Sequence, residues 1–340
     1  MNVPKIDTKL TAKDFATDQD VRWCPGCGDY AILKAVQRTM PEIGVPKENM
    51  VFISGIGCAA RFPYYMNTYG FHTIHGRAPA FATGLKLANP ELDVWVVSGD
   101  GDALSIGGNH LLHILRRNVN LQFLLFNNEI YGLTKGQYSP TSRLGTRTPS
   151  TPQGSVDRPT NPCAFALGTG ARFVGRSYDV GAKHLPEVLK RAHAHQGTGF
   201  VEILQNCIVY NDGVFGHITE KQVAGEAQLH VENGEPLIYG KDKDKGIRLN
   251  PKTLTLESVT LGRDGITEDD LLVHDETNPV LATLLAQMEP PHMPVAMGVL
   301  YDSPAPTYEA AVTGQVQAAM EKKPNATINE LLHSGHTWTV

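Results

Sequence analysis

The sequence predicts an α/β fold, in which a parallel sheet is covered by helices on both faces, and three observations predict it. Short runs of continuously apolar residues recur along the chain up to residue 205. They alternate with longer segments of helical periodicity, a pattern typical of parallel sheets whose strands are buried on both sides. A chain of 340 residues, 41% of them hydrophobic, is also long enough to bury a substantial core.

The predicted elements follow one another in a regular order. The first is a helix over residues 29–40, where apolar side chains recur at helical spacing. Five apolar runs are predicted strands, at residues 51–54, 93–98, 121–126, 171–175 and 200–205. Further helices are predicted between them, at residues 78–88, 103–117 and 183–195.

Two segments lack these patterns. Residues 135–162 are rich in Ser, Thr, Pro, Gly and Arg, and a loop of that length inside a compact domain is usually functional or disordered. Beyond about residue 212 the alternation weakens. We therefore predict an α/β domain over residues 1–220 and an extension over residues 221–340 that packs on this domain or on a partner subunit; a solvated tail is the alternative.

The composition excludes several classes of function. The formal net charge is −5 and no basic cluster is present, so the charge gives no reason to expect binding to nucleic acid. No stretch approaches eighteen apolar residues, and the amino terminus does not have the pattern of a signal peptide. We therefore expect a cytoplasmic protein that does not associate with membranes.

The most informative motif lies at the ends of two consecutive predicted strands. Gly99-Asp100-Gly101 follows the strand at 93–98, and Asn127-Asn128 follows the strand at 121–126. Either motif alone is a common turn, but strand, GDG, helix, strand and NN occur here in that order. Carboxylate and amide oxygens, completed by phosphate oxygens, suit Mg²⁺, and glycines let the backbone approach a diphosphate closely. The pair resembles the signature of thiamine diphosphate enzymes, in which magnesium bridges the protein to the cofactor.

Two cysteines fall at the same edge of the predicted sheet as this motif. Cys58 follows the first strand and Cys207 follows the fifth. Ligands of parallel sheets bind at the carboxyl ends of the strands, so the cysteines and the magnesium ligands are predicted to form one functional region.

The remaining cysteines leave several alternatives open. Cys24 and Cys27 form a CxxC motif, which by itself fits a redox dithiol, half of a metal site or coincidence. Together with Cys58 and Cys207 they would supply four thiolates, which suit either tetrahedral zinc or an iron–sulfur cluster. Only one pair is close in sequence, and this wide spacing favours a [4Fe–4S] cluster. Cys163, near a predicted helix start, is interpreted as a small buried apolar residue.

Several long motifs, taken together, resemble one family, the β subunits of 2-oxoacid:ferredoxin oxidoreductases. The matching stretches are WCPGCGDY, SGIGCAARFPYY, FHTIHGRAPAFATGLKLANP, VVSGDGDALSIGGNH and LLFNNEIYGLTKGQYSPTS, followed by Cys207 after VEILQN. The resemblance extends over residues 20–215 and is loose beyond them. The stretch YGLTKGQYSPTS is more similar to the 2-oxoglutarate type than to the pyruvate type.

The resemblance implies a fold and a set of ligands. The fold would be the diphosphate domain of thiamine diphosphate enzymes. The [4Fe–4S] cluster would be held by Cys24, Cys27, Cys58 and Cys207. The magnesium ion would be held by Asp100, Asn128 and the backbone carbonyl of Ile130. The diphosphate or thiazolium would be lined by backbone groups of Gly57, Cys58, Gly101, Asp102, Gly132 and Leu133.

Three further side chains have alternatives that need no function. His75, the predicted catalytic residue, would approach the cofactor or the substrate; a histidine satisfied within the core or at the surface is the alternative. Arg77 and Lys135 are weaker candidates for the substrate carboxylate or the phosphates of coenzyme A, and exposed surface charges are the alternative.

The resemblance also implies an activity and partners. The reaction would be the reversible, coenzyme A-dependent oxidative decarboxylation of 2-oxoglutarate to succinyl-CoA and CO₂, with electrons passed through the cluster to ferredoxin. No pyrimidine-binding domain is recognisable in the chain, so an α subunit is expected to complete the site, as αβ dimerising to α2β2. The alternatives are specificity for pyruvate or a branched-chain 2-oxoacid, half of a non-redox thiamine-dependent decarboxylase with a structural zinc site, or a zinc-containing scaffold without chemistry.

Overall fold

The computed structural model describes residues 10–338, and its centre is an eight-stranded sheet with the order β2-β1-β3-β4-β6-β5-β11-β7. Neighbouring strands are parallel except β5 and β11, which run antiparallel. The strands are β1 (Met50–Ser54), β2 (Tyr69–His72), β3 (Asp93–Gly99), β4 (Leu121–Asn127), β5 (Phe173–Tyr178), β6 (Thr198–Leu204), β7 (Gln228–Val231) and β11 (Val295–Asp302). All five predicted strands are present, and the predicted α/β fold is confirmed.

Alternate residues of the central strands face two separate apolar cores. In β1, Val51 and Ile53 belong to one core, whereas Met50 and Phe52 belong to the other. All residues of β4 are buried. Because both faces of the sheet are covered, these strands carry continuous apolar runs instead of alternating with polar residues.

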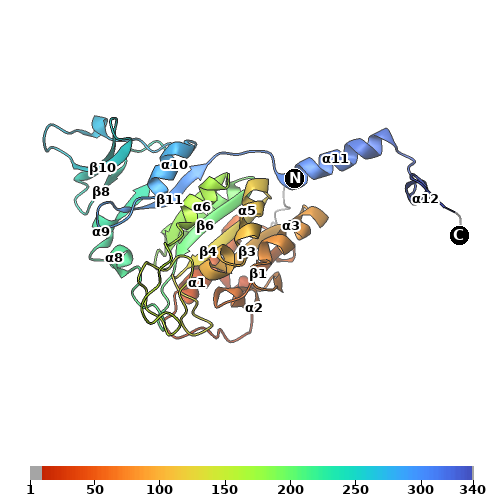
Figure 1. Ribbon diagram of the computed structural model, residues 1–340, viewed down its shortest axis with the longest axis horizontal. Helices are drawn as coiled ribbons and strands as arrows, with labels where there is room; N and C mark the ends of the chain where they lie inside the picture. The colour runs from red at the N-terminus through yellow and green to blue at the C-terminus, as the bar shows by residue number, and fades with distance from the viewer. Residues whose placement is uncertain (1–9, 339–340) are drawn as a thin grey trace.

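Helices cover both faces of the sheet (Figure 1). The core on one face is built with α1 (Asp29–Ile43) and α7 (His184–Ala194). The other core is built with α3 (Ala78–Ala88), α5 (Gly108–Arg117), α6 (Pro162–Gly168) and α10 (Pro279–Ala286). The other helical segments are α2 (Phe62–Tyr65), α4 (Asp100–Leu104), α8 (Gly216–Thr219), α9 (Ala224–Ala227), α11 (Tyr308–Lys322), α12 (Ile328–Leu332), and the 3-10 turns η1 (Ala12–Phe15), η2 (Lys47–Asn49), η3 (Ala59–Arg61) and η4 (Glu268–Asp270).

The helix predicted over residues 103–117 is wrong in one respect, because it is divided into α4 and α5. The break comes where the chain passes very close to the segment around Gly76. A Cβ atom built on Gly107 would lie 2.4 Å from the carbonyl oxygen of Asp102, and one on Gly76 would lie 2.5 Å from the Gly107 nitrogen. The two glycines thus let two backbones meet beside Asp102, and a continuous helix would not allow this approach.

The C-terminal part of the chain is more closely tied to the sheet than predicted. Both β7 and β11 lie beyond residue 220 and extend the main sheet, so the predicted boundary between 220 and 221 does not separate two units. A second, antiparallel sheet consists of β8 (Ile238–Tyr239), β9 (Lys245–Asn250) and β10 (Thr255–Thr260). Beyond β11, α11 and α12 project away from the sheet (Figure 1).

Residues 128–161 form neither helix nor strand, in agreement with the predicted loop at 135–162. The loop is nevertheless packed, since Ser139, Thr141 and Ser142 are buried. Within residues 10–338, no helix is both long and apolar enough to cross a membrane.

Candidate functional site

Two adjoining pockets lie at the carboxyl ends of the central strands. The first, here called the glycine-rich pocket, brings together ten of the predicted site residues: Gly57, Cys58, His75, Asp100, Gly101, Asp102, Asn128, Ile130, Gly132 and Leu133. The second, here called the cysteine pocket, has a volume of about 190 Å³ and is lined by Cys24, Cys27, Cys58 and Cys207. Cys58 and Asn128 line both pockets, so the two predicted ligand sets are contiguous.

Asp100 is held by a loop that sequence reasoning did not connect to it. It is the first residue of α4 and is 2% exposed. Its Oδ2 accepts hydrogen bonds from Ser139 Oγ and Thr141 Oγ1, each at 2.5 Å. Burial raises the pKa of Asp100 to about 6, against the effect of these hydroxyl groups. A buried carboxylate of this kind fits a cation, because the cation would supply the charge that the surroundings lack.

Asn127, the last residue of β4, and Asn128, which follows it, line different pockets. Asn128 lines the glycine-rich pocket, and its Nδ2 donates to Gln205 Oε1 at 2.7 Å. Its Oδ1 accepts from the Ile130 backbone nitrogen at 3.2 Å, closing a tight turn in which Glu129 has a φ of 55°. Gln205 was not predicted as a site residue. It directly follows β6, so it lies at the carboxyl end of a strand, as the other candidates do.

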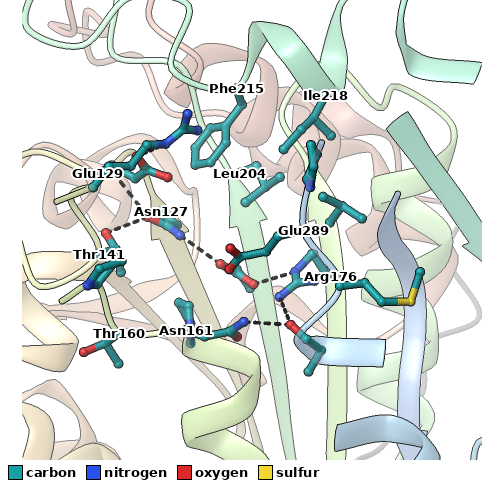
Figure 2. A pocket seen from close by; sticks show the side chains of 18 of the residues that line it. Asn127, Glu129, Thr141, Thr160, Asn161, Arg176, Leu204, Phe215, Ile218 and Glu289 are labelled. Carbon is teal, nitrogen blue, oxygen red and sulfur yellow. Dashed lines mark hydrogen bonds and ion pairs between the residues drawn. The ribbon is translucent and has the colours of Figure 1, made fainter. Parts of the chain in front are cut away.

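Asn127 lines a different cavity, of about 250 Å³ (Figure 2). Its Nδ2 donates to Glu202 Oε1 at 2.8 Å, and Glu202 forms a buried ion pair with Arg176 at 2.7 Å. Cys163 is fully buried and donates its thiol hydrogen to Glu202 over 3.1 Å. Cys163 is therefore outside the cysteine pocket, and it makes a polar contact that the interpretation as an apolar residue did not include.

Asp102 has a role that differs from the predicted backbone contact. It is 3% exposed, and its Oδ1 is 2.5 Å from His75 Nδ1. The same oxygen accepts from the backbone nitrogens of Gly76 and Ile56, at 2.7 Å and 3.1 Å. The Asp102 side chain therefore fixes the His75 ring and joins the loops after β1 and β2. The His75 side chain is 40% exposed and lines the glycine-rich pocket.

Close packing around Gly101 leaves no room for a side chain. A Cβ atom there would lie 2.2 Å from Tyr131 Cε1, while the Tyr131 hydroxyl donates to the Gly101 carbonyl at 2.9 Å. The glycine of the GDG motif thus allows the tyrosine ring to close one wall of the pocket.

Three thiols of the cysteine pocket, those of Cys27, Cys58 and Cys207, lie in surroundings that disfavour their charged form. Burial, and after it the negative charge of Asp29, raises the pKa of Cys58 to about 12 and that of Cys27 further still. Burial also raises the pKa of Cys207. A bound metal centre would reverse this, because coordination deprotonates a thiol outright.

The arrangement of the pocket also fits a group larger than one side chain. A Cβ atom on Gly132 would lie 3.4 Å from Cys207 Sγ and 3.7 Å from Cys58 Sγ, so the two thiols approach the same bare stretch of backbone. Within residues 10–338, no three His, Cys, Asp or Glu side chains are grouped to hold a single metal ion. The cysteines surround a cavity and do not converge on one point.

Asp29 lines both pockets and was not predicted as a site residue, although it belongs to the motif WCPGCGDY. It is 1% exposed, and within the described part of the chain neither carboxylate oxygen has a hydrogen-bond partner. Burial raises the pKa of Asp29 to about 7. A buried polar group without a partner points to a ligand or metal beside it.

Two weaker candidates are not brought to either pocket. Arg77 donates to the backbone oxygen of Ile106 at 3.4 Å, and Lys135 is exposed with a φ of 75°. Their contacts with the substrate or coenzyme A stay predictions.

Known proteins share these features of sequence and fold. Residues 55–203 match the family described as thiamine pyrophosphate enzyme, C-terminal TPP binding domain. The 2-oxoglutarate oxidoreductase subunit KorB of Mycobacterium tuberculosis is 49% identical, over 99% of this chain and 91% of its own length. The β subunit of 2-oxoacid:ferredoxin oxidoreductase 1 of Aeropyrum pernix is 48% identical, over 56% of this chain and 60% of that one.

A solved structure extends the likeness to the whole fold. The 2-oxoglutarate:ferredoxin oxidoreductase from Magnetococcus marinus, with 2-oxoglutarate, coenzyme A and succinyl-CoA bound, has a TM-score of 0.77 and 32% identity. The match covers 96% of this chain and 97% of that chain. This chain therefore belongs to the family of β subunits of 2-oxoacid:ferredoxin oxidoreductases.

Proposed function

We propose that this chain is the β subunit of a 2-oxoglutarate:ferredoxin oxidoreductase. With an α subunit, the enzyme would convert 2-oxoglutarate and coenzyme A to succinyl-CoA and CO₂, reversibly, and pass the electrons to ferredoxin. The observation that carries this proposal is the shared wall of the two pockets, where Cys58 and Asn128 border both. An oxygen-rich site and a thiol-rich site in direct contact suit a decarboxylation that is coupled to electron transfer.

The glycine-rich pocket suits thiamine diphosphate with Mg²⁺. Asp100, Asn128 and the Ile130 carbonyl would hold the ion, and the bare backbone at Gly57, Gly101 and Gly132 would lie against the cofactor. When bound, thiamine diphosphate supplies the nucleophilic carbon and the electron sink for loss of CO₂. The protein contributes the positions of these oxygens and a site closed by the Tyr131 ring.

His75 is the side chain that we propose for proton handling. The Asp102 carboxylate accepts a hydrogen bond from His75 Nδ1 at 2.5 Å. The ring proton therefore lies on Nδ1, and Nε2 is left free to bond a ligand. Asp102 is itself fixed by Ser98 Oγ at 2.6 Å. This chain of contacts orients the ring before any substrate arrives.

The cysteine pocket suits a [4Fe–4S] cluster held by Cys24, Cys27, Cys58 and Cys207. When bound, such a cluster accepts single electrons. Cys58 would place one ligand in the wall of the glycine-rich pocket, so the path between the two groups would be short. The non-redox decarboxylase and the zinc-containing scaffold give no role to this contact.

The partners that we propose for this chain follow from its relatives. The relatives named above are subunits or whole oxidoreductases, and an α subunit would supply the pyrimidine side of the thiamine site. We further propose α2β2 assembly and ferredoxin as the electron acceptor. 2-Oxoglutarate is preferred over pyruvate because the relative covering nearly the whole chain and the matched solved structure carry that substrate in their names.

The test is to co-express the chain with its α subunit and to purify the complex without oxygen. A brown protein, bleached by dithionite and reducing viologen dye with 2-oxoglutarate and coenzyme A, is expected. The β chain alone should show no turnover. A colourless complex with stoichiometric zinc would exclude the oxidoreductase.

A further inference from the structure

Two irregular loops meet beside the predicted cofactor site. The magnesium loop consists of residues 128–130 and carries two of the proposed magnesium ligands. The cysteine loop consists of residues 206–215, which end at the start of α8, and carries Cys207. The magnesium loop is held in an uncommon conformation, because Glu129 has a φ of 55°, a region that costs a residue with a side chain about 1 kcal/mol or more. Contacts from outside the magnesium loop must therefore stabilise it.

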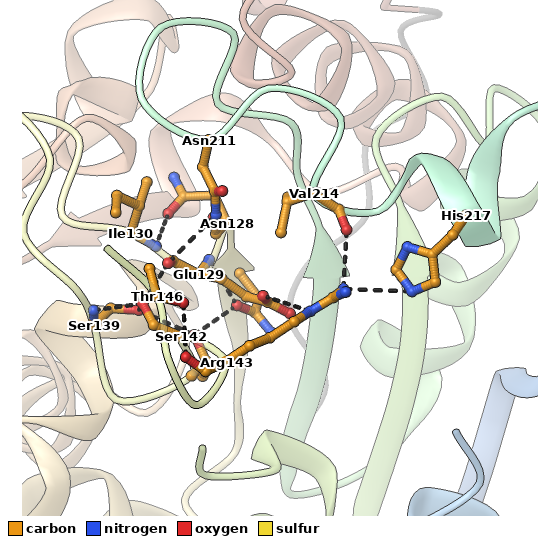
Figure 3. Close-up of polar contacts among 12 residues, drawn as sticks. Asn128, Glu129, Ile130, Ser139, Ser142, Arg143, Thr146, Asn211, Val214 and His217 are labelled. Atoms are coloured by element: carbon orange, nitrogen blue, oxygen red, sulfur yellow. Dashed lines mark hydrogen bonds and ion pairs between the residues drawn. The ribbon is translucent and has the colours of Figure 1, made fainter. Parts of the chain in front are cut away.

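Asn211 makes such a contact from the cysteine loop (Figure 3). Its Nδ2 donates to the Asn128 carbonyl at 2.9 Å and reaches the Glu129 carbonyl at 3.4 Å. Its backbone nitrogen donates to the Cys207 carbonyl at 3.0 Å. One residue is thus bonded on one side to a proposed cluster ligand and on the other to a proposed magnesium ligand.

Arg143 makes a second connection between the same loops (Figure 3). Its Nε donates to Glu129 Oε2 at 3.1 Å, and its Nη2 donates to the Val214 carbonyl at 2.9 Å and approaches His217 Nε2 at 3.4 Å. Ser142, next to it in the chain, donates to the Glu129 carbonyl at 2.5 Å. The long loop after β4 therefore holds the magnesium loop and the cysteine loop together.

From these contacts we infer that Asn211 and Arg143 are positioning residues, which couple the loop carrying Cys207 to the loop carrying the magnesium ligands. The inference rests on the proposed function. It adds that binding of magnesium and thiamine diphosphate at one loop orders the cysteine loop, and that this fixes the place of the cluster relative to the cofactor.

The experiment measures amide hydrogen exchange in the αβ complex before and after Mg²⁺ and thiamine diphosphate are added. In the wild type, exchange within residues 206–214 should slow on addition. Asn211→Asp, which keeps the shape of the side chain but removes the donor, should lose this slowing. Asn211→Asp should also raise the thiamine diphosphate concentration for half-saturation about tenfold, and Asn211→Gln, which retains the amide, should recover part of the effect.

A matched control lies at the opposite edge of the sheet. Asn118 Nδ2 donates to the Ala305 carbonyl at 3.1 Å, so Asn118→Asp removes the same kind of bond far from the site. It should leave both readouts at the wild-type level. Equal slowing in Asn211→Asp and in the wild type, or an equal loss in Asn118→Asp, would overturn the inference.

Arg143→Gln keeps the test decisive if Asn211→Asp loses its iron. The Arg143 side chain is half exposed and its hydrogen bonds go to Glu129, Val214 and His217, not to Cys207 or Asn211, so its replacement should preserve the fold and the cluster. Reduced slowing in residues 206–214 supports the coupling, and unchanged slowing contradicts it. The wild type separates the two proposals: if it binds no thiamine diphosphate, the proposed function fails whatever the variants do.

Discussion

The two pockets differ in how far the protein alone satisfies their polar groups. In the glycine-rich pocket, Asp100 accepts two hydroxyl hydrogen bonds and Asp102 holds His75 and two backbone nitrogens. In the cysteine pocket, burial keeps the thiols of Cys27, Cys58 and Cys207 protonated.

This difference indicates that the glycine-rich pocket is preformed and the cysteine pocket is not. Hydrogen bonds from the protein fix the carboxylates of Asp100 and Asp102 in the glycine-rich pocket, and a ligand there would find these two groups in place. The cysteine pocket gains its full set of interactions only when a metal centre converts thiols to thiolates. Replacing a ligand in the cysteine pocket should therefore disrupt the cluster severely without affecting the other pocket. Replacing a ligand in the glycine-rich pocket should weaken cofactor binding by degrees.

The largest effect is expected for Cys207→Ser. A replaced second-sphere partner of a metal typically costs 10–100-fold in affinity or activity, so a replaced ligand should reduce ferredoxin-linked turnover more than about 100-fold. Visible absorption and EPR of the αβ complex should show a lost or altered cluster, while thiamine diphosphate still binds. A variant with the wild-type spectrum would show that Cys207 is not a ligand.

Asp100→Ala should have the next largest effect, and on the other pocket. Removing the buried carboxylate should weaken thiamine diphosphate binding about 100-fold, equivalent to roughly 2.7 kcal/mol, because it removes the charge that would face the ion. Calorimetric titration with Mg²⁺ present measures the affinity, and the cluster spectrum should be retained. If binding and cluster are lost together, the two pockets are not separable.

The control for Asp100→Ala lies at the other end of β3, the strand that precedes Asp100. Asp93 is also buried and accepts from Trp95 Nε1 at 2.9 Å, at the amino-terminal edge of the sheet. Asp93→Ala should lower stability without changing the affinity for the cofactor.

Asp102→Asn tests whether the glycine-rich pocket is preorganised. The amide keeps the size of the side chain but holds the His75 ring and the backbone nitrogens less well, so kcat should fall about tenfold while thiamine diphosphate affinity changes little. The pH profile of kcat should shift as well, since the partner of the ring has lost its charge. An unchanged profile would assign Asp102 to the fold alone.

The sequence was sufficient for the strands and for the edge at which the site lies, because apolar runs and parallel connections have clear patterns. It also identified Asp100, Asn128 and the four cysteines as neighbours, since each follows a strand or belongs to a recognisable motif. It did not predict the partners that hold them. Ser139, Thr141 and Asn211 are hydroxyl and amide residues in loops, and their spacing carries no period that would link them to Asp100 or Cys207.

The C-terminal strands were missed for a different physical reason. β7 is only four residues long, so its local pattern is weak. β11 carries an apolar run, VAMGVLY, but its pairing with β5, more than a hundred residues earlier in the chain, leaves no local sign. The division of the predicted helix at 103–117 depends on the approach of Gly76 to Gly107, which is again a contact between distant segments.

The smallest effect on activity is expected for Cys163→Ala, which tests the distinction between the structural cysteine and the proposed cluster ligands. Cys163 is fully buried and donates to Glu202, which also accepts from Arg176 at 2.7 Å and Asn127 at 2.8 Å. Removing the thiol leaves a small cavity and one fewer donor, so the free energy of unfolding should fall by about 1–2 kcal/mol. Denaturant titration measures this loss, while iron content and turnover should equal those of the wild type. A loss of iron in Cys163→Ala would mean that the boundary between structural and ligand cysteines is drawn in the wrong place, because Cys163 lies outside the cysteine pocket and its thiol is already hydrogen-bonded to Glu202.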